Sequence, residues 1–202
     1  GGGRGLTVGP RALGLGDDER ALREAVEGKV VMVTGASSGI GEAAARRIGG
    51  AGGTVLLVAR SEEELERIAG EIGETAHAMP CDLNDLDAID RLAADALEEH
   101  GHVDVLVNNA GRSIRRSLDR SGDRFHDFER TMQLNYFGAI RLVMGLIPAM
   151  KAAERGHVVN VSSIGVQTNP PRFSAYVASK AALDSWSNVV SSELVGDGIT
   201  FT

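Results

Sequence analysis

Cysteine and aromatic residues are scarce in this 202-residue sequence, which has one cysteine, one tryptophan, two tyrosines and 4% aromatic residues overall. One cysteine cannot form a disulfide within the chain, so Cys81 favours a reducing compartment. Long apolar runs are absent as well. None approaches the ~20 residues that span a bilayer, and the N-terminus lacks the apolar stretch of a signal peptide. We therefore expect a cytoplasmic protein without a transmembrane segment.

Positive charge is also in short supply, because 21 Lys and Arg residues face 28 Asp and Glu residues and give a net charge of −7. Proteins that bind nucleic acids or anionic membrane surfaces need basic patches, so this balance argues against both partners. The only metal-like spacing among the histidines is the sequence HGH at 100–102, which is typical of a surface turn. We predict no metal site. The five histidines are at positions 77, 100, 102, 126 and 157.

Glycine, by contrast, is abundant at 26 residues, and it gathers first at the N-terminus. Residues 1–16, GGGRGLTVGPRALGLG, predict a flexible segment or a linker from an upstream module. Residues 17–202 are then expected to form one domain, since this length is enough for a single core. The sequence ends GDGITFT, inside an expected strand, so we expect the C-terminal part of the domain to be missing.

Short β-rich apolar runs alternate with helical patterns along the chain, after a short acidic helix within 17–28. This alternation predicts an α/β fold, a doubly wound parallel sheet with helices on both faces and ligands at the carboxyl ends of the strands. Pro148 is expected to bend or end the fourth of the longer helices. The expected strands are 29–34, 54–58, 76–80, 103–107, 157–161 and 199–202, and the expected longer helices are 40–50, 62–72, 86–99, 125–155 and 176–194.

The bend TGASSGIG, residues 34–41, joins the first strand to the next helix and carries three glycines. Free backbone N–H groups and the helix dipole at such a turn favour an anion, here the pyrophosphate of a dinucleotide. No lysine follows as in a P-loop, so a nucleoside triphosphate is not favoured. The competing interpretation is a tight turn that binds nothing. The expected cofactor contacts in this bend are Gly35, Ser37, Ser38, Gly39, Ile40 and Gly41.

The second strand ends VLLVARSEEE, with no acid at Val58 or Ala59 and with Arg60 next. An acid there would accept hydrogen bonds from the ribose of NAD, whereas a guanidinium matches the oxygens of a 2′-phosphate. We therefore expect NADPH, with NAD less favoured. Alternatively, Arg60 is an ordinary solvated charge. After the third strand, Asp82 and Leu83 are expected beside the adenine, although Asp82 also fits an acid at the start of a helix.

The fourth strand runs into NNAG, residues 108–111, which places polar amides and a small turn at its carboxyl end. We expect Asn109, Ala110 and Gly111 to lie beside the cofactor. Alternatively, Asn108 or Asn109 only braces neighbouring backbone.

Tyr176 and Lys180 stand four residues apart, so they share one face of a helix. A free phenol, with a pKa of ~10, is a poor acid at neutral pH, but a nearby ammonium lowers that pKa. Tyr176 is therefore a candidate general acid. Such a pair occurs by chance on many helices, where each side chain is simply a satisfied polar residue. The interpretation depends on its position after the fifth strand.

Taken in order, the segments TGASSGIG, NNAG, LNYFG, NVSSIG and YVASK make residues 29–202 resemble the short-chain dehydrogenase/reductase family. The resemblance implies a catalytic tetrad of Asn135, Ser163, Tyr176 and Lys180. In that tetrad, Tyr176 donates a proton to a carbonyl, and Ser163 hydrogen-bonds its oxygen. Lys180 lowers the tyrosine pKa and, like Tyr176, contacts the cofactor, while Asn135 anchors a water. Ser163 matches the family pattern better than Ser162.

Residues 136–186, together with 22–41, also resemble the C-terminal reductase module of two-module bacterial fatty acyl-CoA reductases. This implies an apolar substrate, a long-chain acyl-CoA or fatty aldehyde. The rival is a free-standing reductase of ketones, such as 3-oxoacyl thioesters or hydroxysteroids. A different class is a non-catalytic NADP-binding sensor. The family also implies a homo-oligomer through helices 125–155 and 176–194. Arg115 and Arg116 either touch an anionic substrate or form a solvated rim.

Overall fold

The computed structural model describes residues 15–202. The flexible segment predicted for residues 1–16 lies outside the described residues, apart from its last two, and the boundary at residue 17 stays a prediction. The strands are β1 (Val30–Thr34), β2 (Thr54–Ala59), β3 (Ala76–Pro80), β4 (Val105–Asn108), β5 (Gly156–Asn160) and β6 (Ile199–Phe201). The helices are α1 (Leu15–Val26), α2 (Gly39–Gly50), α3 (Glu62–Ile72), α4 (Leu86–His100), α5 (His126–Met132), α6 (Ala139–Ala152), α7 (Gly165–Thr168) and α8 (Ser174–Leu194).

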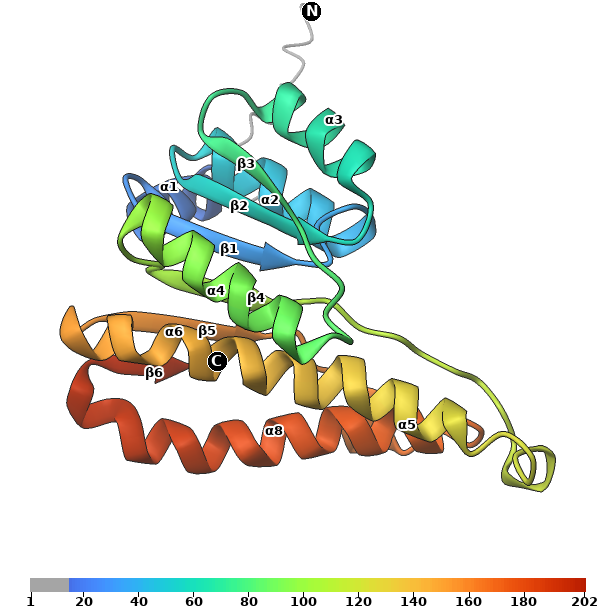
Figure 1. Ribbon diagram of the computed structural model, residues 1–202. Coiled ribbons are helices and arrows are strands. Elements are labelled where there is room, and N and C mark those ends of the chain that lie inside the picture. The colour runs from blue at the N-terminus through green and yellow to red at the C-terminus, as the bar shows by residue number, and fades with distance from the viewer. Residues whose placement is uncertain (1–14) are drawn as a thin grey trace, which may run out of the picture.

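The strands form one parallel sheet in the order β3-β2-β1-β4-β5-β6 (Figure 1). The predicted doubly wound parallel sheet is therefore confirmed. After β1 the chain builds outward to β2 and β3, and then returns to place β4 on the other side of β1. The strand order thus reverses between β1 and β4, and the carboxyl ends of strands at such a point are where ligands bind in open α/β sheets.

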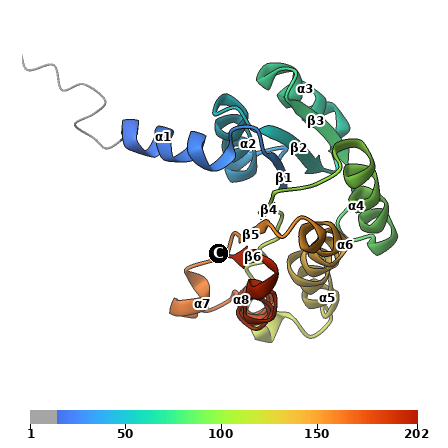
Figure 2. The ribbon, with the colours of Figure 1, turned by 90° about the vertical axis from the view of Figure 1, so that its left-hand side faces the viewer.

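Both faces of the sheet are buried, which explains why its central strands read as continuous apolar runs. Along β1, Val31 and Val33 face one cluster, which includes side chains of α2 and α3. Met32 faces the other cluster, which includes side chains of α4 and α6. Figure 2 shows α2 and α4 on opposite sides of the sheet. The two clusters hold the carboxyl ends of the strands, and with them the loops, in fixed positions.

The segment predicted as one helix over 125–155 is divided into α5, a π-helical turn at Gln133–Gly138, and α6. Gly138 packs against the segment that precedes α4. A Cβ added at this glycine would clash with the carbonyl oxygen of Leu83. Of the two outcomes predicted for Pro148, an end of the helix is wrong, because α6 continues to Ala152, and a bend stays a prediction. A proline removes a single hydrogen bond of the helix ladder, and here the buried side of α6 outweighs that loss.

Other differences from the prediction are small. Strand ends shift by one or two residues, α8 begins at Ser174 rather than at 176, and the short helix α7 lies in a loop for which no helix was predicted. Within residues 15–202, none of the helices is both long enough and apolar enough to cross a membrane.

Candidate active site

The turn after β1 is shaped by its glycines. Gly35 and Gly39 have φ of +67° and +58°, in the left-handed region that glycine adopts without strain. A Cβ on Gly41 would press on the carbonyl oxygen of Gly35 and lie 2.5 Å from Asn109 Nδ2. The Ser38 side chain makes no capping hydrogen bond to α2. The first amides of α2 are therefore free to bind an anion.

Asn109 holds this turn against β4. Its Nδ2 donates to the carbonyl oxygen of Thr34 at 2.9 Å, and the hydroxyl of Thr34 accepts from the backbone amides of Asn109 and Ala110 at 3.0 Å each. Asn109 thus braces neighbouring backbone, as one alternative proposed, while Asn108 donates to a side-chain oxygen, Asn160 Oδ1, at 3.0 Å. Thr34, which the sequence analysis passed over, positions the turn.

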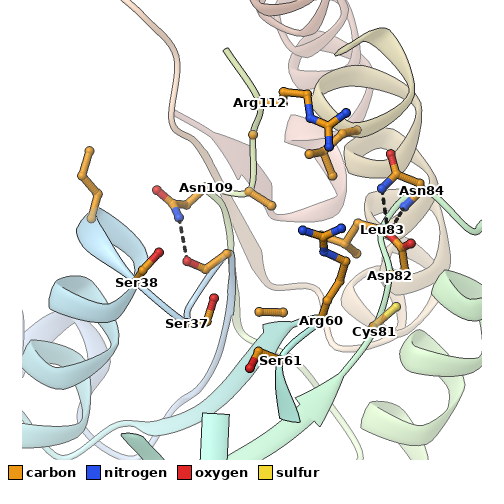
Figure 3. Close-up of a pocket in the computed structure, with 16 residues that line it drawn as sticks. Ser37, Ser38, Arg60, Ser61, Cys81, Asp82, Leu83, Asn84, Asn109 and Arg112 are labelled. Atoms are coloured by element: carbon orange, nitrogen blue, oxygen red, sulfur yellow. Dashed lines mark hydrogen bonds between the residues drawn. The ribbon is translucent and has the colours of Figure 1, made fainter. Parts of the chain in front are cut away.

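A cavity of about 740 Å³ opens between the carboxyl ends of β1, β2, β3 and β4 (Figure 3). Its volume falls within the range of ~300–1,000 Å³ typical of ligand sites. Gly39, Gly41, Tyr176 and Lys180, also predicted to contact the cofactor, do not line it. The predicted residues that line it are Gly35, Ser37, Ser38, Ile40, Arg60, Asp82, Leu83, Asn109, Ala110 and Gly111. The unpredicted ones are Ala59, Ser61, Cys81, Asn84, Arg112 and Leu134.

Two guanidinium groups, those of Arg60 and Arg112, point into this cavity (Figure 3). Asp82 lies below them and accepts hydrogen bonds from the backbone amide and the side chain of Asn84, at 3.0 and 2.7 Å. The backbone hydrogen bond is the main cause that lowers the Asp82 pKa, and both arginines lower it further. Asp82 does not cap α4, because Asp85 does so.

Cys81 lines the same cavity from the end of β3. Burial, together with the charges of Asp82 and Asp85, raises the pKa of its thiol to about 11. The thiolate, which is the nucleophilic form, is therefore scarce at neutral pH. Cys81 is therefore a poor nucleophile at neutral pH.

Asn135 and Lys180 meet around Gly111. A Cβ on Gly111 would lie 3.4 Å from Asn135 Oδ1 and 3.5 Å from Lys180 Nζ. The amide of Asn135, which is 1% exposed, accepts from the Arg112 backbone amide at 2.7 Å and donates to the Arg112 carbonyl at 2.9 Å. It also donates to Ser179 Oγ at 2.9 Å. The π-helical turn thus fixes Asn135 on the loop that follows β4.

Lys180 is buried in α8, one turn after the half-buried Tyr176, as the spacing predicted. Its Nζ donates to the carbonyl oxygen of Val161 at 2.7 Å. Burial lowers the pKa of Lys180, and the charge of Asp184 partly offsets this. An ammonium has three N–H donors, so two remain for other partners. Ser179, absent from the sequence prediction, donates to the Tyr176 carbonyl at 2.7 Å and to none of the cavity residues.

The two adjacent serines differ in how their hydroxyl groups are used: one donates a hydrogen bond within the protein and the other accepts one. Ser162 Oγ donates its proton to Asp184 Oδ2 at 2.7 Å, so its only donor is taken. Ser163 Oγ instead accepts from the backbone amide of Gly165 at 3.1 Å. Its O–H is therefore free to donate to a substrate oxygen. This difference favours Ser163 on physical grounds that the sequence pattern did not contain.

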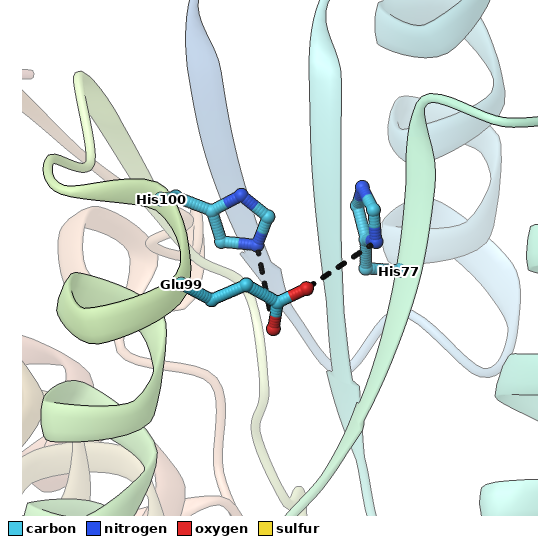
Figure 4. Close-up of side chains that lie close together, drawn as sticks. All are labelled: His77, Glu99 and His100. Carbon is cyan, nitrogen blue, oxygen red and sulfur yellow. Dashed lines mark ion pairs between the residues drawn. The ribbon is translucent and has the colours of Figure 1, made fainter.

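A separate group of side chains lies at the other end of β3 (Figure 4). His77 Nδ1 is 4.0 Å from one Glu99 oxygen, and His100 Nε2 is 3.9 Å from the other. The three ligand atoms lie within 4.8 Å of one another, which makes the group a candidate metal site, and the prediction of no metal site stays a prediction. No spacing in the sequence signals this group, because His77 is distant in sequence from Glu99 and His100. The group lies away from the cofactor cavity, so no step of a reaction there involves it.

The fold and the cavity define a dinucleotide-binding α/β protein. Residues 29–202 match the short chain dehydrogenase family, and the chain belongs to it. The chain is 58% identical over 189 residues to an uncharacterized oxidoreductase of Mycobacterium tuberculosis, covering 91% of this chain and 55% of that protein. It is 56% identical over 187 residues to a fatty acyl-CoA reductase of Acinetobacter baylyi, covering 91% and 63%.

A solved structure of a metagenomic short-chain oxidoreductase in complex with NADP aligns with a TM-score of 0.83 at 36% identity. The alignment covers 88% of this chain and 81% of that one. The chain spans 55–63% of the length of the two curated relatives named above.

Proposed function

We propose that this chain is the NADPH-binding part of a reductase that converts a carbonyl to an alcohol, or the reverse. The observation that carries the proposal is the meeting of buried Lys180 and Asn135 around Gly111, at the rim of the cavity where the strand order reverses. Bound NADPH supplies the hydride. The residues of this chain bind the dinucleotide, orient the carbonyl and supply the proton.

Each polar residue of the tetrad has a separate role in the proposal. Tyr176 donates the proton to the carbonyl oxygen, because Lys180, one turn on, stabilises the phenolate that remains. Ser163 donates its free hydroxyl proton as a hydrogen bond to the same oxygen and stabilises the charge that develops there. Asn135 holds the loop at Arg112 and orders the surroundings of Lys180. Proton and hydride together reduce the carbonyl by two electrons.

The cofactor is proposed to be NADPH rather than NADH. The β2 end offers Arg60 where an acid would select NADH, and Arg112 adds a second guanidinium to the same cavity. The turn after β1 supplies free amides for the pyrophosphate. The relative solved with NADP supports this choice.

The substrate is proposed to be a fatty aldehyde, which one hydride and one proton reduce to the alcohol, or a long-chain acyl-CoA. With the thioester, the same hydride and proton would give a hemithioacetal, whose C–S bond then breaks to release coenzyme A as its thiol and leave the aldehyde. The support is the fatty acyl-CoA reductase of Acinetobacter baylyi at 56% identity. Ketones such as 3-oxoacyl thioesters or hydroxysteroids are the alternative, since family membership fixes chemistry better than substrate.

The test is NADPH oxidation by the full-length protein against a panel from short ketones to long-chain aldehydes and acyl-CoAs. The expected result is turnover that rises with chain length and falls at least about a thousandfold in Tyr176→Phe, while NADPH affinity is kept. Turnover of ketones alone would contradict the fatty substrate and favour a ketone reductase. Tight NADPH binding without turnover would contradict the enzyme and favour a non-catalytic NADP-binding sensor.

We further propose a homo-oligomer through α5–α6 and α8. Met144 on α6 and Val189 on α8 are 57% and 59% exposed, which leaves apolar surface on both helices. Sedimentation of the protein as a monomer at micromolar concentration would contradict this.

A further inference from the structure

A second cavity, of about 440 Å³, lies between the loop that follows β4 and the segment that precedes α8. We call it the arginine pocket, and it is lined by Arg115, Arg116, Ser117, Asp119, Arg120 and Arg172. Four arginines and a single acidic residue thus line one cavity, in a chain whose net charge is −7. Like charges at close range repel one another, so an anion bound between these arginines is stabilised by them.

One of the four arginines anchors the pocket to the fold. Arg116 Nε donates to Asp127 Oδ2 at 3.1 Å, and Arg124 pairs with the same carboxylate. Hydrogen bonds from Arg124 first, and from Arg116, lower the pKa of Asp127. Asp127, whose side chain is 9% exposed, therefore stays charged and fixes Arg116 in place.

The other three arginines, Arg115, Arg120 and Arg172, lack such a partner. Among the residues that the structure describes, the ion pairs of this region all involve Asp127. These three arginines are exposed, and no ion pair or side-chain hydrogen bond to a described residue occupies their guanidinium groups, which leaves them available to a ligand. Guanidinium groups bind phosphate oxygens in pairs of parallel hydrogen bonds, and they do so better than they bind single acceptors.

The backbone of Arg172 is held in a strained conformation. Its φ is +75°, which non-glycine residues rarely adopt, and its carbonyl oxygen accepts from the Arg116 backbone amide at 2.7 Å. This hydrogen bond joins the two segments that form the pocket. Strain of this kind persists where the surroundings impose it, and here it places Arg172 on the pocket wall.

The arginine pocket is close to the proposed proton donor. Arg172 precedes Tyr176 by four residues, so their Cα atoms are at most about 15 Å apart at ~3.8 Å per residue. The loop that carries Arg115, Arg116 and Arg120 leaves β4 through Gly111, beside Lys180. In Figure 1 this loop extends beyond the carboxyl ends of the strands, toward the start of α8. The positive end of the α8 dipole adds to the local potential.

We propose that the arginine pocket binds the phosphate groups of a coenzyme A thioester while its carbonyl lies at Tyr176. This rests on the proposed function for the carbonyl chemistry. A pantetheine arm has about thirteen backbone bonds, the length of about four extended residues, or ~15 Å. That length is enough to span the at most about 15 Å between the Cα atoms of Arg172 and Tyr176. The phosphates then supply binding energy at a distance from the reacting carbon, and orient the thioester.

The first test measures binding without turnover. Calorimetry with coenzyme A, in the presence of saturating NADP+ so that the cofactor cavity is filled, should show binding to the unaltered protein. Affinity should fall about ten- to a hundredfold in the double variant Arg115→Gln, Arg120→Gln. The exposed Arg130→Gln should bind as the unaltered protein does. Pantetheine, which has no phosphate, should bind at least tenfold more weakly than coenzyme A.

Within this test, 4′-phosphopantetheine separates the two phosphate sources. Binding equal to that of coenzyme A assigns the pocket to the 4′-phosphate, and weaker binding assigns it to the nucleotide end. Either result supports the proposal. Equal affinity for coenzyme A and pantetheine, or an unchanged affinity in the double variant, would overturn it.

A kinetic test separates the pocket from the proposed chemistry. With one fatty chain presented as the acyl-CoA and as the free aldehyde, the double variant should raise the KM of the acyl-CoA about ten- to a hundredfold and leave that of the aldehyde within twofold. Equal changes for both substrates would overturn the pocket while the reductase stands. If neither substrate reacts, the proposed function fails, and the calorimetry still decides whether the pocket binds phosphate.

Discussion

The nucleotide side and the substrate side of the proposed site are built in different ways. On the nucleotide side, the turn after β1 depends on backbone geometry, with positive φ at Gly35 and Gly39 and close packing at Gly41. On the substrate side, the geometry depends on side-chain hydrogen bonds. The Asn135 amide accepts from the Arg112 backbone, Ser162 donates its proton to a carboxylate, and Ser163 accepts from a backbone amide. The turn is therefore sensitive to added volume at Gly41, and the substrate side is sensitive to the loss of individual hydrogen-bond donors and acceptors.

Among the changes that compare these two regions, the largest effect is expected from the two serines, tested against each other. Ser163→Ala should lower kcat about a hundred- to a thousandfold, because it removes a donor to the developing oxyanion. Ser162→Ala should lower kcat less than about threefold, since its hydroxyl donates to Asp184. Both variants are measured by NADPH oxidation at saturating substrate, with NADPH affinity as the control that should not change. A greater loss of kcat in Ser162→Ala would reverse the assignment.

The next prediction concerns the close packing at Gly41 on the nucleotide side. Gly41→Ala should destabilise the fold by about 2–3 kcal/mol through overpacking, and lower NADPH affinity about a hundredfold because the turn must move. The measurements are denaturant unfolding and fluorescence titration with NADPH. Gly70→Ala is the matched control, because a Cβ at Gly70 in α3 meets nothing within 4 Å. It should stabilise the protein by about 0.5–1 kcal/mol. Equal behaviour of both variants would show that the turn is not sterically fixed.

Arg60 is the one place on the nucleotide side where a side chain is expected to select the ligand. Arg60→Gln should weaken NADPH binding about ten- to a hundredfold by removing a charge-assisted hydrogen bond. NADH, which lacks the 2′-phosphate, should bind within about twofold as before, and so serves as the internal control. Titration with both cofactors measures this. If Arg112→Gln shows the selective loss instead, Arg112 is the partner of the 2′-phosphate.

The same contrast explains what the sequence could predict. Gly35 and Gly41 belong to one short continuous segment, residues 34–41, and strands buried on both faces read as apolar runs. The fold and the glycine turn after β1 were therefore predictable from the sequence. Arg116 and Arg172 are joined only by a hydrogen bond across 56 residues of sequence, and His77 meets Glu99 only through packing. Arg112 is one residue past the NNAG motif, yet only the fold turns it toward Arg60. Contacts of this kind depend on tertiary packing, which no local pattern contains.

The smallest expected effect concerns Lys180 on the substrate side, because burial of its ammonium group lowers the free energy of unfolding. Burial lowers its pKa in the folded chain below the unfolded value of about 10.4. Below the folded pKa, both states are charged and the desolvation cost is fully present. Between the two pKa values the unfolded chain binds more protons, so stability rises with pH. Lys180→Met removes this dependence. At neutral pH, Lys180→Met should have a higher unfolding free energy than the unaltered protein, by on the order of 1 kcal/mol. This difference should shrink as pH rises toward 10.4, because the unaltered protein becomes more stable.

The measurement is urea unfolding of the unaltered protein and Lys180→Met at matched pH values, so that titrations of other groups cancel in the difference. The variant also loses the 2.7 Å hydrogen bond to the Val161 carbonyl, which shifts the difference by a nearly constant amount. The slope of the difference with pH, rather than its size, is thus the decisive quantity. A difference that stays flat or grows with pH would mean that Lys180 is not desolvated. The substrate side would then lack the buried cation on which Tyr176 depends.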